Sequence, residues 1–325
     1  MTKKRDWPNQ LIVMGIAACL TLSAGIGSAR ASAPRVVVTI KPLHSLVAGM
    51  MHDVGTPELI VRGSLSPHLY AFRPSDIGML EKADLVIWVG ATMETFLHRH
   101  FTHSGYGTNV VSPLKMRGVT LLAKRRGTKW EPDYDEVGQV GMRSDDMNSW
   151  VDAHIWLDPH NARAFIEGLE GILARHDPDN GQIYARNGKR LRSRLAKLES
   201  ELKTQLASHR TDVYLVFHDA YQYFERRFGL HPVGSITVHP ENPPSARRIV
   251  EVRGLVVERG ATCVFSEPQF KSGIVERLIH ETGARHGVLD PIGADLNLGP
   301  DLYFDLLSNL AQSLSDCLQP VPRIR

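Results

Sequence analysis

Three histidines and one aspartate stand close to short apolar runs that read as buried strands; they are His68, His154, His218 and Asp290. His218, for example, directly follows the apolar run 213–217. Three imidazoles and one carboxylate suit a tetrahedral zinc ion, whereas Mn²⁺ favours more oxygen ligands. A single histidine among the 15 in the chain is more typical of a capping or surface residue. The pattern by itself therefore leaves two readings open, a shared zinc site and a set of separate structural residues.

Short apolar strands alternate with helical segments through most of the chain. In the first half, strands are expected at 35–40, 58–61, 84–89 and 109–111, and helices from Pro42, at 75–82 and at 92–102. In the second half, strands are expected at 213–217, 262–265 and 288–289, with helices between them at 246–259 and 272–282 and a last helix after Pro300. This alternation predicts an α/β fold with parallel sheets covered on both faces.

A long helix is expected over 182–208, where leucines recur at helical spacing between charged residues. At 1.5 Å per residue it would be about 40 Å long, enough to join two lobes stiffly. The predicted architecture is two Rossmann-like lobes, 32–181 and 209–325, with a single domain carrying a long surface helix as the alternative. Because strand ends line the ligand crevice of open α/β sheets, the candidate metal residues should meet in the cleft between the lobes.

The N-terminus is typical of a secretory signal peptide over 1–31, with a basic start, the apolar run 11–22 and a small-residue cleavage site at Ala29–Ala31. Lipoprotein anchoring through Cys19 is the alternative, although the apolar run continues past that cysteine. The segment carries four of the 38 Lys and Arg and one of the 35 Asp and Glu. The mature chain then holds 34 of each, a neutral balance that does not favour nucleic acid as a partner.

Two cysteines, Cys263 and Cys317, remain after the signal segment is removed. In an exported protein such a pair predicts one disulfide, with two separate buried thiols as the alternative. Cys317 shares one face of the last helix with Leu307, Leu310 and Leu314, and this face should point at the sheet that contains Cys263.

Residues 124–150 interrupt the strand–helix pattern with many acidic residues, three glycines and little apolar content. This composition predicts a mobile, solvated loop. The loop contains no histidine, so shielding of the cleft is favoured over collection of metal ions.

Several segments in order resemble the metal-binding solute receptors of ABC importers, and most closely their zinc-uptake branch (ZnuA-like, cluster A-I). They are Lys41–His44, His68–Asp76, Ala83–Gly90, His154–Pro159, Phe217–Tyr221, Ser266–Phe270 and Leu289–Gly293. The resemblance covers nearly the whole mature chain. It implies His68, His154 and His218 as zinc ligands, with Asp290 as a fourth and sometimes vacant position. The cysteine pair is also similar to that branch.

The resemblance implies a monomeric periplasmic receptor that captures Zn²⁺ and delivers it to a membrane permease with a cytoplasmic ATPase, without enzymatic activity. Two departures matter. Pro67 stands where the branch often has a glutamate, and loop 124–150 lacks the branch's histidines. A manganese or iron receptor of the same fold is the first alternative, although manganese receptors tend to carry glutamate at the position of His218. A zinc hydrolase with Glu241 or Glu267 as base is the second. In the receptor reading these two glutamates orient ligands.

Overall fold

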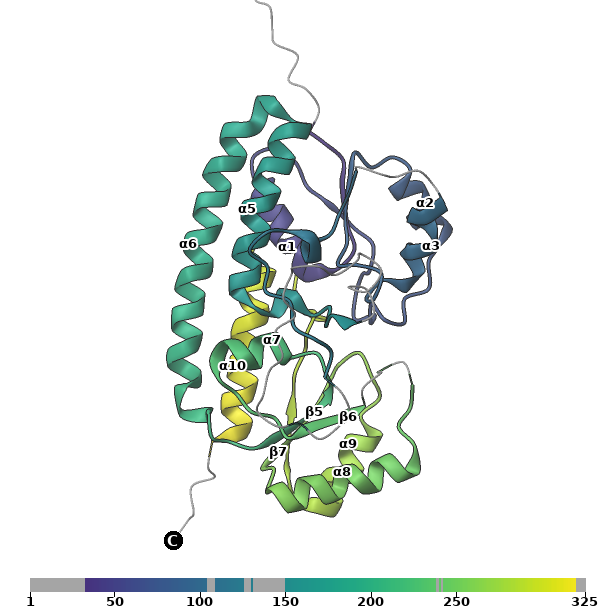
Figure 1. The fold of residues 1–325 in the computed structure, drawn as a ribbon, viewed down its shortest axis with the longest axis vertical. Helices are drawn as coiled ribbons and strands as arrows, with labels where there is room; N and C mark the ends of the chain where they lie inside the picture. The colour runs from purple at the N-terminus through teal and green to yellow at the C-terminus, as the bar shows by residue number, and fades with distance from the viewer. Residues whose placement is uncertain are drawn as a thin grey trace, which may run out of the picture. The chain divides into compact units, whose positions relative to one another are not determined.

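Two parallel sheets of four strands each form the framework of the protein (Figure 1). The first, in the order β2-β1-β3-β4, consists of β1 (Val36–Val38), β2 (Glu58–Leu59), β3 (Leu85–Ile87) and β4 (Val110–Val111). The second, in the order β6-β5-β7-β8, consists of β5 (Tyr214–His218), β6 (Gly234–Thr237), β7 (Cys263–Ser266) and β8 (Arg285–Val288). Every strand pairing within these sheets is parallel. The α/β class predicted from the alternation is confirmed.

The computed structural model describes residues 33–103, 109–125, 130, 150–237, 240 and 242–319. The predicted signal segment with Cys19, Glu241 and nearly all of loop 124–150 lie outside these described residues. Within them, no helix is both long enough and apolar enough to cross a membrane.

Helices cover both faces of the two sheets. They are α1 (Lys41–Met50), α2 (Pro74–Leu80), α3 (Thr95–His103), α5 (Pro159–His176), α6 (Gly181–Gln205), α7 (Gln222–Phe228), α8 (Ala246–Arg259), α9 (Gly273–Thr282) and α10 (Leu302–Leu318). Short 3₁₀ turns occupy Pro113–Lys115, Ile155–Leu157, Pro178–Asn180 and Leu206–His209.

One large apolar core runs through both sheets and the helices between them, and two smaller cores lie under the outer helices. Alternation along β1 shows how the strands divide these layers. Val36 and Val38 belong to the large core, whereas Val37 belongs to the outer core beneath α2 and α3. Side chains of successive strand residues point to opposite faces, so one short apolar strand serves two layers.

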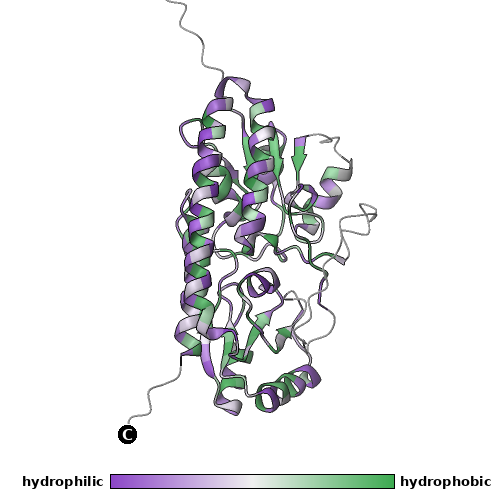
Figure 2. Ribbon diagram, turned by 60° about the vertical axis from the view of Figure 1, so that its left-hand side comes forward, coloured by the Kyte–Doolittle hydropathy of each residue, from purple (hydrophilic) through white to green (hydrophobic). Residues whose placement is uncertain are grey.

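The long helix predicted over 182–208 is α6, which joins the two lobes (Figures 1 and 2). Its 25 residues span about 38 Å. The leucines that carried the prediction are buried, namely Leu191, Leu195, Leu198, Leu202 and, in the following turn, Leu206. Helices α1, α5 and α10 pack against α6. Helix α6 is therefore fixed to both halves of the chain by the shared core.

Two edge strands differ from the sequence expectation. Strand β6 was not expected, and β8 begins at Arg285 where the run 288–289 was predicted. Both lie at the edge of the second sheet, and their sequences, Gly-Ser-Ile-Thr and Arg-His-Gly-Val, contain no apolar run. Strand β6 is buried, but its Gly, Ser and Thr residues carry little apolar signal, and β8 is partly exposed with a similarly weak signal.

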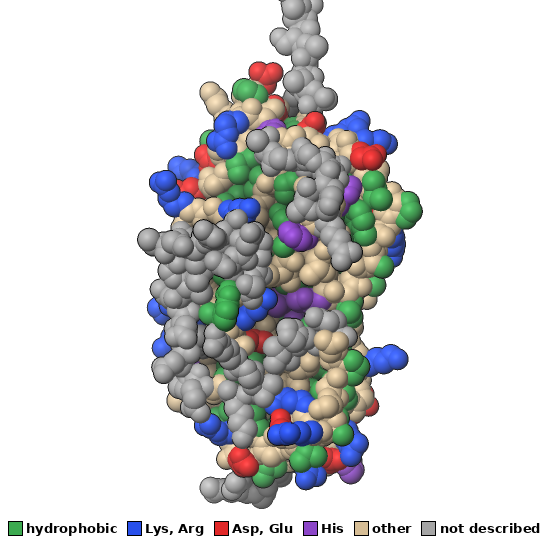
Figure 3. Space-filling model, turned by 45° about the vertical axis from the view of Figure 1, so that its right-hand side comes forward, with side chains coloured by type: hydrophobic (Ala, Val, Ile, Leu, Met, Phe, Trp, Pro, Cys, Tyr) green, Lys and Arg blue, Asp and Glu red, His purple; other side chains and the backbone are tan. Residues whose placement is uncertain are grey.

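The molecular surface carries both signs of charge. Among the described residues, Lys and Arg side chains are interspersed with Asp and Glu over the face drawn in Figure 3. This distribution agrees with the neutral balance expected for the mature chain.

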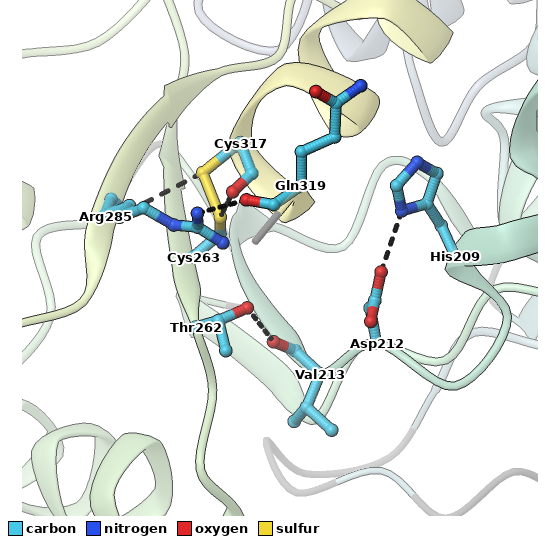
Figure 4. Close-up of a disulfide and its surroundings, with 8 residues drawn as sticks. All are labelled: His209, Asp212, Val213, Thr262, Cys263, Arg285, Cys317 and Gln319. Carbon is cyan, nitrogen blue, oxygen red and sulfur yellow. Dashed lines mark hydrogen bonds and ion pairs between the residues drawn. A yellow bond between two sulfur atoms is a disulfide. The ribbon is translucent and has the colours of Figure 1, made fainter. Parts of the chain in front are cut away.

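The predicted disulfide between Cys263 and Cys317 is confirmed (Figure 4). Cys263 begins β7 and Cys317 lies in the last turn of α10, with their Cα atoms 6.1 Å apart. Next to the bond, the Arg285 guanidinium donates a hydrogen bond to the carbonyl oxygen of Gln319. The end of α10 is thereby attached to the second sheet.

Candidate metal centre

Three imidazole rings converge between the two sheets. The Nε2 atom of His154 lies 3.3 Å from Nε2 of His68 and 3.4 Å from Nε2 of His218. Two nitrogens that bind one tetrahedral zinc at the usual bond length are separated by about 3.3 Å. Among the described residues, these three histidines form the group able to hold one metal ion. Histidine side chains are visible near the middle of the face drawn in Figure 3.

His68 is placed by a tight turn in the loop between β2 and α2. Its backbone N–H donates to Ser66 Oγ at 3.3 Å, and the N–H of Leu69 donates to the Ser66 carbonyl at 3.2 Å. Pro67 fixes the backbone within this turn. The loop therefore presents the His68 ring to the other two histidines.

His154 immediately precedes the 3₁₀ turn Ile155–Leu157 and is held by Asp152. Asp152 Oδ1 accepts from the His154 ring Nδ1 at 2.7 Å and from its backbone N–H at 3.1 Å. A carboxylate on Nδ1 fixes the tautomer that leaves Nε2 with a free lone pair. This lone pair faces the other two rings.

His218 is the last residue of β5, where the sequence prediction placed it directly after the strand. The neighbouring strand β7 ends at Ser266 and is followed by Glu267, whose Oε1 accepts from His218 Nδ1 at 2.6 Å. Parallel neighbours end at the same edge of a sheet, which brings these two residues together. Glu267 thus orients His218 as Asp152 orients His154.

Electrostatics distinguish the two buried histidines. Burial lowers the pKa of His154 well below its ordinary value, and the charges of His218 and Lys124 lower it further. Burial also acts to lower the pKa of His218, but the charge and hydrogen bond of Glu267 outweigh it and raise that pKa. His154 is therefore neutral at neutral pH, while His218 is the histidine of this pair that takes up a proton more readily.

With Nδ1–H directed at carboxylates, the neutral rings of His154 and His218 turn Nε2 lone pairs toward each other at 3.4 Å. Two facing lone pairs repel unless a cation lies between them. Two cavities border the rings, one of about 10 Å³ and one of about 90 Å³, and the smaller one has room for one ion or one water. The arrangement suits a single small cation.

Asp290, the fourth ligand expected from the resemblance, does not lie with the histidines. It is absent from the group of described residues that could share an ion, and it lines neither of the two cavities beside the rings. Its carboxylate instead accepts hydrogen bonds from backbone N–H groups of the loop that follows it. Asp290 as a fourth ligand stays a prediction.

The model of the ZnuA family, described as zinc-uptake complex component A periplasmic, matches residues 36–317. The chain belongs to the ZnuA family.

Relatives in the ZnuA family are similar over most of their length. The high-affinity zinc uptake system protein ZnuA of Brucella abortus (strain 2308) is 41% identical over 305 residues, which cover 87% of this chain and 91% of the relative. The protein of the same name from Yersinia pestis is 34% identical over 328 residues, covering 98% and 100%.

Solved structures show the same fold. A crystal structure of ZnuA matches with a TM-score of 0.73 at 24% identity, covering 88% of this chain and 100% of that one. The periplasmic zinc binding protein TroA from Treponema pallidum matches with a TM-score of 0.74 at 19% identity, covering 88% and 99%.

A buried acidic group lies beside the ZnuA-family histidines and was not predicted. The Arg125 guanidinium donates to Asp219 Oδ1 at 3.1 Å and to Glu225 Oε2 at 2.6 Å, and it stacks on the Trp130 ring at 4.1 Å. Burial raises the pKa of Glu225 to about 7, against the lowering effect of Arg125. Arg125 thus ties the first residues of loop 124–150 to the second lobe, next to His218.

Asp152 is the functional residue that sequence reasoning missed most directly. It stands two residues before His154, and a short Asp-x-His spacing was a usable signal for a carboxylate that holds a ligand. Glu267 was expected to orient a ligand, and the structure places it on His218. Glu241, the other glutamate named for this role, lies outside the described residues.

Proposed function

We propose that this chain is the zinc-binding receptor of an ABC-type zinc importer. It captures Zn²⁺ in the periplasm and hands it to a membrane permease that a cytoplasmic ATPase drives. The observation that carries the proposal is the convergence of three imidazoles, in which His154 Nε2 lies at the spacing of a tetrahedral zinc site from Nε2 of both His68 and His218. The names of the relatives, high-affinity zinc uptake system proteins, support the same cargo. Binding is coordination alone, without making or breaking covalent bonds.

The proposed ligands are His68, His154 and His218, each through Nε2, with Asp290 or a solvent water at the fourth position. Asp152 and Glu267 hold the two buried rings by their Nδ1 atoms. We further propose a monomer that begins after a cleaved signal peptide, 1–31. Its lobes, 32–181 and 209–325, would flank the linking helix.

Native mass spectrometry of residues 32–325, combined with competition between Zn²⁺ and Mn²⁺, tests this function. One tightly held zinc and weak manganese binding are expected. A protein that holds manganese as well as zinc would move the chain to a manganese receptor. A protein that holds no metal would refute the receptor function.

Zinc affinity is expected to fall as the pH decreases. The ion binds neutral imidazole, so a proton on His218 must leave before zinc binds. Because the pKa of His218 is raised, the fall should begin above the ordinary histidine pKa of about 6.5. Below that raised pKa, each pH unit should cost about tenfold in apparent affinity. Competition titrations from pH 8 to pH 5 measure this, and a flat profile would contradict it.

Replacement of Glu267 by glutamine should weaken zinc binding about 10–100-fold, the usual cost of losing the partner of a ligating histidine. The amide retains an oxygen acceptor but removes the charge that raises the pKa of His218. The onset of the pH-dependent fall should therefore move to lower pH. Glu258→Gln, at an exposed position on α8, serves as control. Unchanged affinity and pH profile in Glu267→Gln would count against this role.

A further inference from the structure

Helix α7 belongs to the second lobe and begins shortly after His218, the last residue of β5. It packs against the 3₁₀ turn Ile155–Leu157 of the first lobe, which directly follows His154. The helix therefore lies between the chain segments that carry these two histidines. Three of its side chains bind residues of the first lobe, namely Tyr223, Glu225 and Arg227.

Tyr223 holds the chain just before His154. Its hydroxyl donates to the carbonyl oxygen of Asp152 at 2.8 Å and accepts from the backbone N–H of Leu122 at 3.0 Å. These two residues are themselves paired, because the N–H of Asp152 donates to the carbonyl oxygen of Leu122 at 2.9 Å. Tyr223 is 1% exposed, so removal of its hydroxyl would take a partner from two backbone groups that water does not reach.

Arg227 holds the chain just after His154. Its Nε and Nη2 donate to the two carboxylate oxygens of Asp158, each at 2.8 Å. Asp158 also caps α5, because its Oδ1 accepts from the backbone N–H of His160. A bidentate pair of this kind fixes orientation as well as distance. Together, Tyr223 and Arg227 bind both ends of the segment Asp152–Asp158, in which His154 lies.

We propose that Tyr223 and Arg227 form a clasp between the lobes that sets the spacing of His154 and His218, so that zinc meets a preformed pair of ligands. This inference rests on the proposed zinc-receptor function and specifies how its site is kept ready for the ion. His218 is fixed to the second sheet as the end of β5. His154 precedes a 3₁₀ turn, and the two bonds from α7 hold its segment next to His218.

The metal-free site needs such a clasp. The Nε2 atoms of His154 and His218 lie 3.4 Å apart, and their facing lone pairs repel each other without a cation. When the clasp is weakened, the rings should be separated in a fraction of the molecules. The apparent zinc affinity then falls in proportion to the fraction that remains competent to bind.

Tyr223→Phe tests the clasp by removing one hydroxyl. The zinc dissociation rate should rise about threefold to tenfold, the usual worth of one buried hydrogen bond. Mixing zinc-loaded protein with an excess of chelator in a stopped-flow instrument measures the rate. Tyr184→Phe is the matched control, because this buried hydroxyl donates to Asp177 at 2.7 Å in the first turn of α6. Both substitutions should lower the metal-free melting temperature, but the control should release zinc at the wild-type rate.

Arg227→Gln tests the other half of the clasp at a less buried position, where folding is expected to survive. Its control is Arg192→Gln, because Arg192 pairs with Glu170 at 2.7 Å and its side chain is 32% exposed, against 28% for Arg227. Arg227→Gln should release zinc about threefold to tenfold faster than the wild type, and Arg192→Gln should not.

Hydrogen exchange gives a readout that a loss of packing alone would not produce. The amide of Asp152 should exchange faster in metal-free Tyr223→Phe than in the wild type, and added zinc should slow it again, because coupling between the ion and the clasp is reciprocal. Wild-type release rates in both Tyr223→Phe and Arg227→Gln would overturn the inference, and so would equally fast release from the two controls. A wild-type protein that binds no zinc would refute the proposed function itself.

Discussion

Replacement of His154 by alanine is expected to abolish tight zinc binding. His154 Nε2 is the atom that approaches both of the other imidazoles, at 3.3 and 3.4 Å. Loss of a residue that merely holds a ligating histidine costs about 10–100-fold in affinity, so loss of the ligand itself should exceed 100-fold. Isothermal titration with a competing chelator measures the difference. Retention of affinity within tenfold would contradict the ligand set.

Thermal unfolding with and without zinc provides a second measurement on the same variant. Zinc at about 1,000 times its dissociation constant should stabilise the wild type by about 4 kcal/mol, and His154→Ala should lose nearly all of this gain. The metal-free melting temperature shows whether the variant is folded, because the substitution also leaves Asp152 without its imidazole partner. His176→Ala, at an exposed position near the end of α5, should behave as the wild type does.

Removal of the disulfide, by Cys263→Ala with Cys317→Ala, is expected to lower the free energy of unfolding of the metal-free protein substantially. The bond closes a loop with a sequence separation of 54 residues, which corresponds to about 4 kcal/mol in the chain-entropy treatment. For a folded chain of this size the melting temperature should fall by roughly 6 °C. Differential scanning calorimetry of the metal-free proteins measures the change.

Zinc affinity should survive this double substitution. Cys263 begins β7 and Glu267 follows its other end, so the bond lies roughly 13 Å along the strand from the nearest residue of the site. Reduction of the wild type by dithiothreitol should reproduce the lower melting temperature. A variant as stable as the wild type would show that the bond contributes little, and a loss of zinc affinity would show that it positions the site.

The sequence predicted those parts of the fold that depend on strong local patterns. The leucines of α6 are buried along one face of the helix, and the apolar run of β5 is buried on both sides of the sheet. Periodicity in the sequence therefore reveals both elements. The edge strands β6 and β8 depend on backbone pairing with one neighbour, and their side chains carry little signal. The same contrast holds within the site.

The three histidines could be named as candidates because their type and their place close to apolar runs were visible in the sequence. The position of Asp290 could not be read in this way. Its carboxylate is bound by backbone N–H groups of Ile292, Gly293 and Ala294, whose direction depends on loop torsions that side-chain identity does not specify. Arg125 was likewise hidden, because its partners Asp219 and Glu225 lie about a hundred residues away.

The division of the core into one large and two small clusters has a consequence for the order in which the parts of the molecule unfold. Both sheets contribute to the large core along α6, so the two lobes should melt together in one cooperative transition. The layers under α2–α3 and α8–α9 belong to the smaller clusters and should exchange their amide hydrogens earlier. His68 lies in the loop that enters α2, whereas His154 and His218 are anchored in the large unit. We therefore expect zinc to leave through local opening of the His68 loop, while α6 and the two buried histidines stay in place.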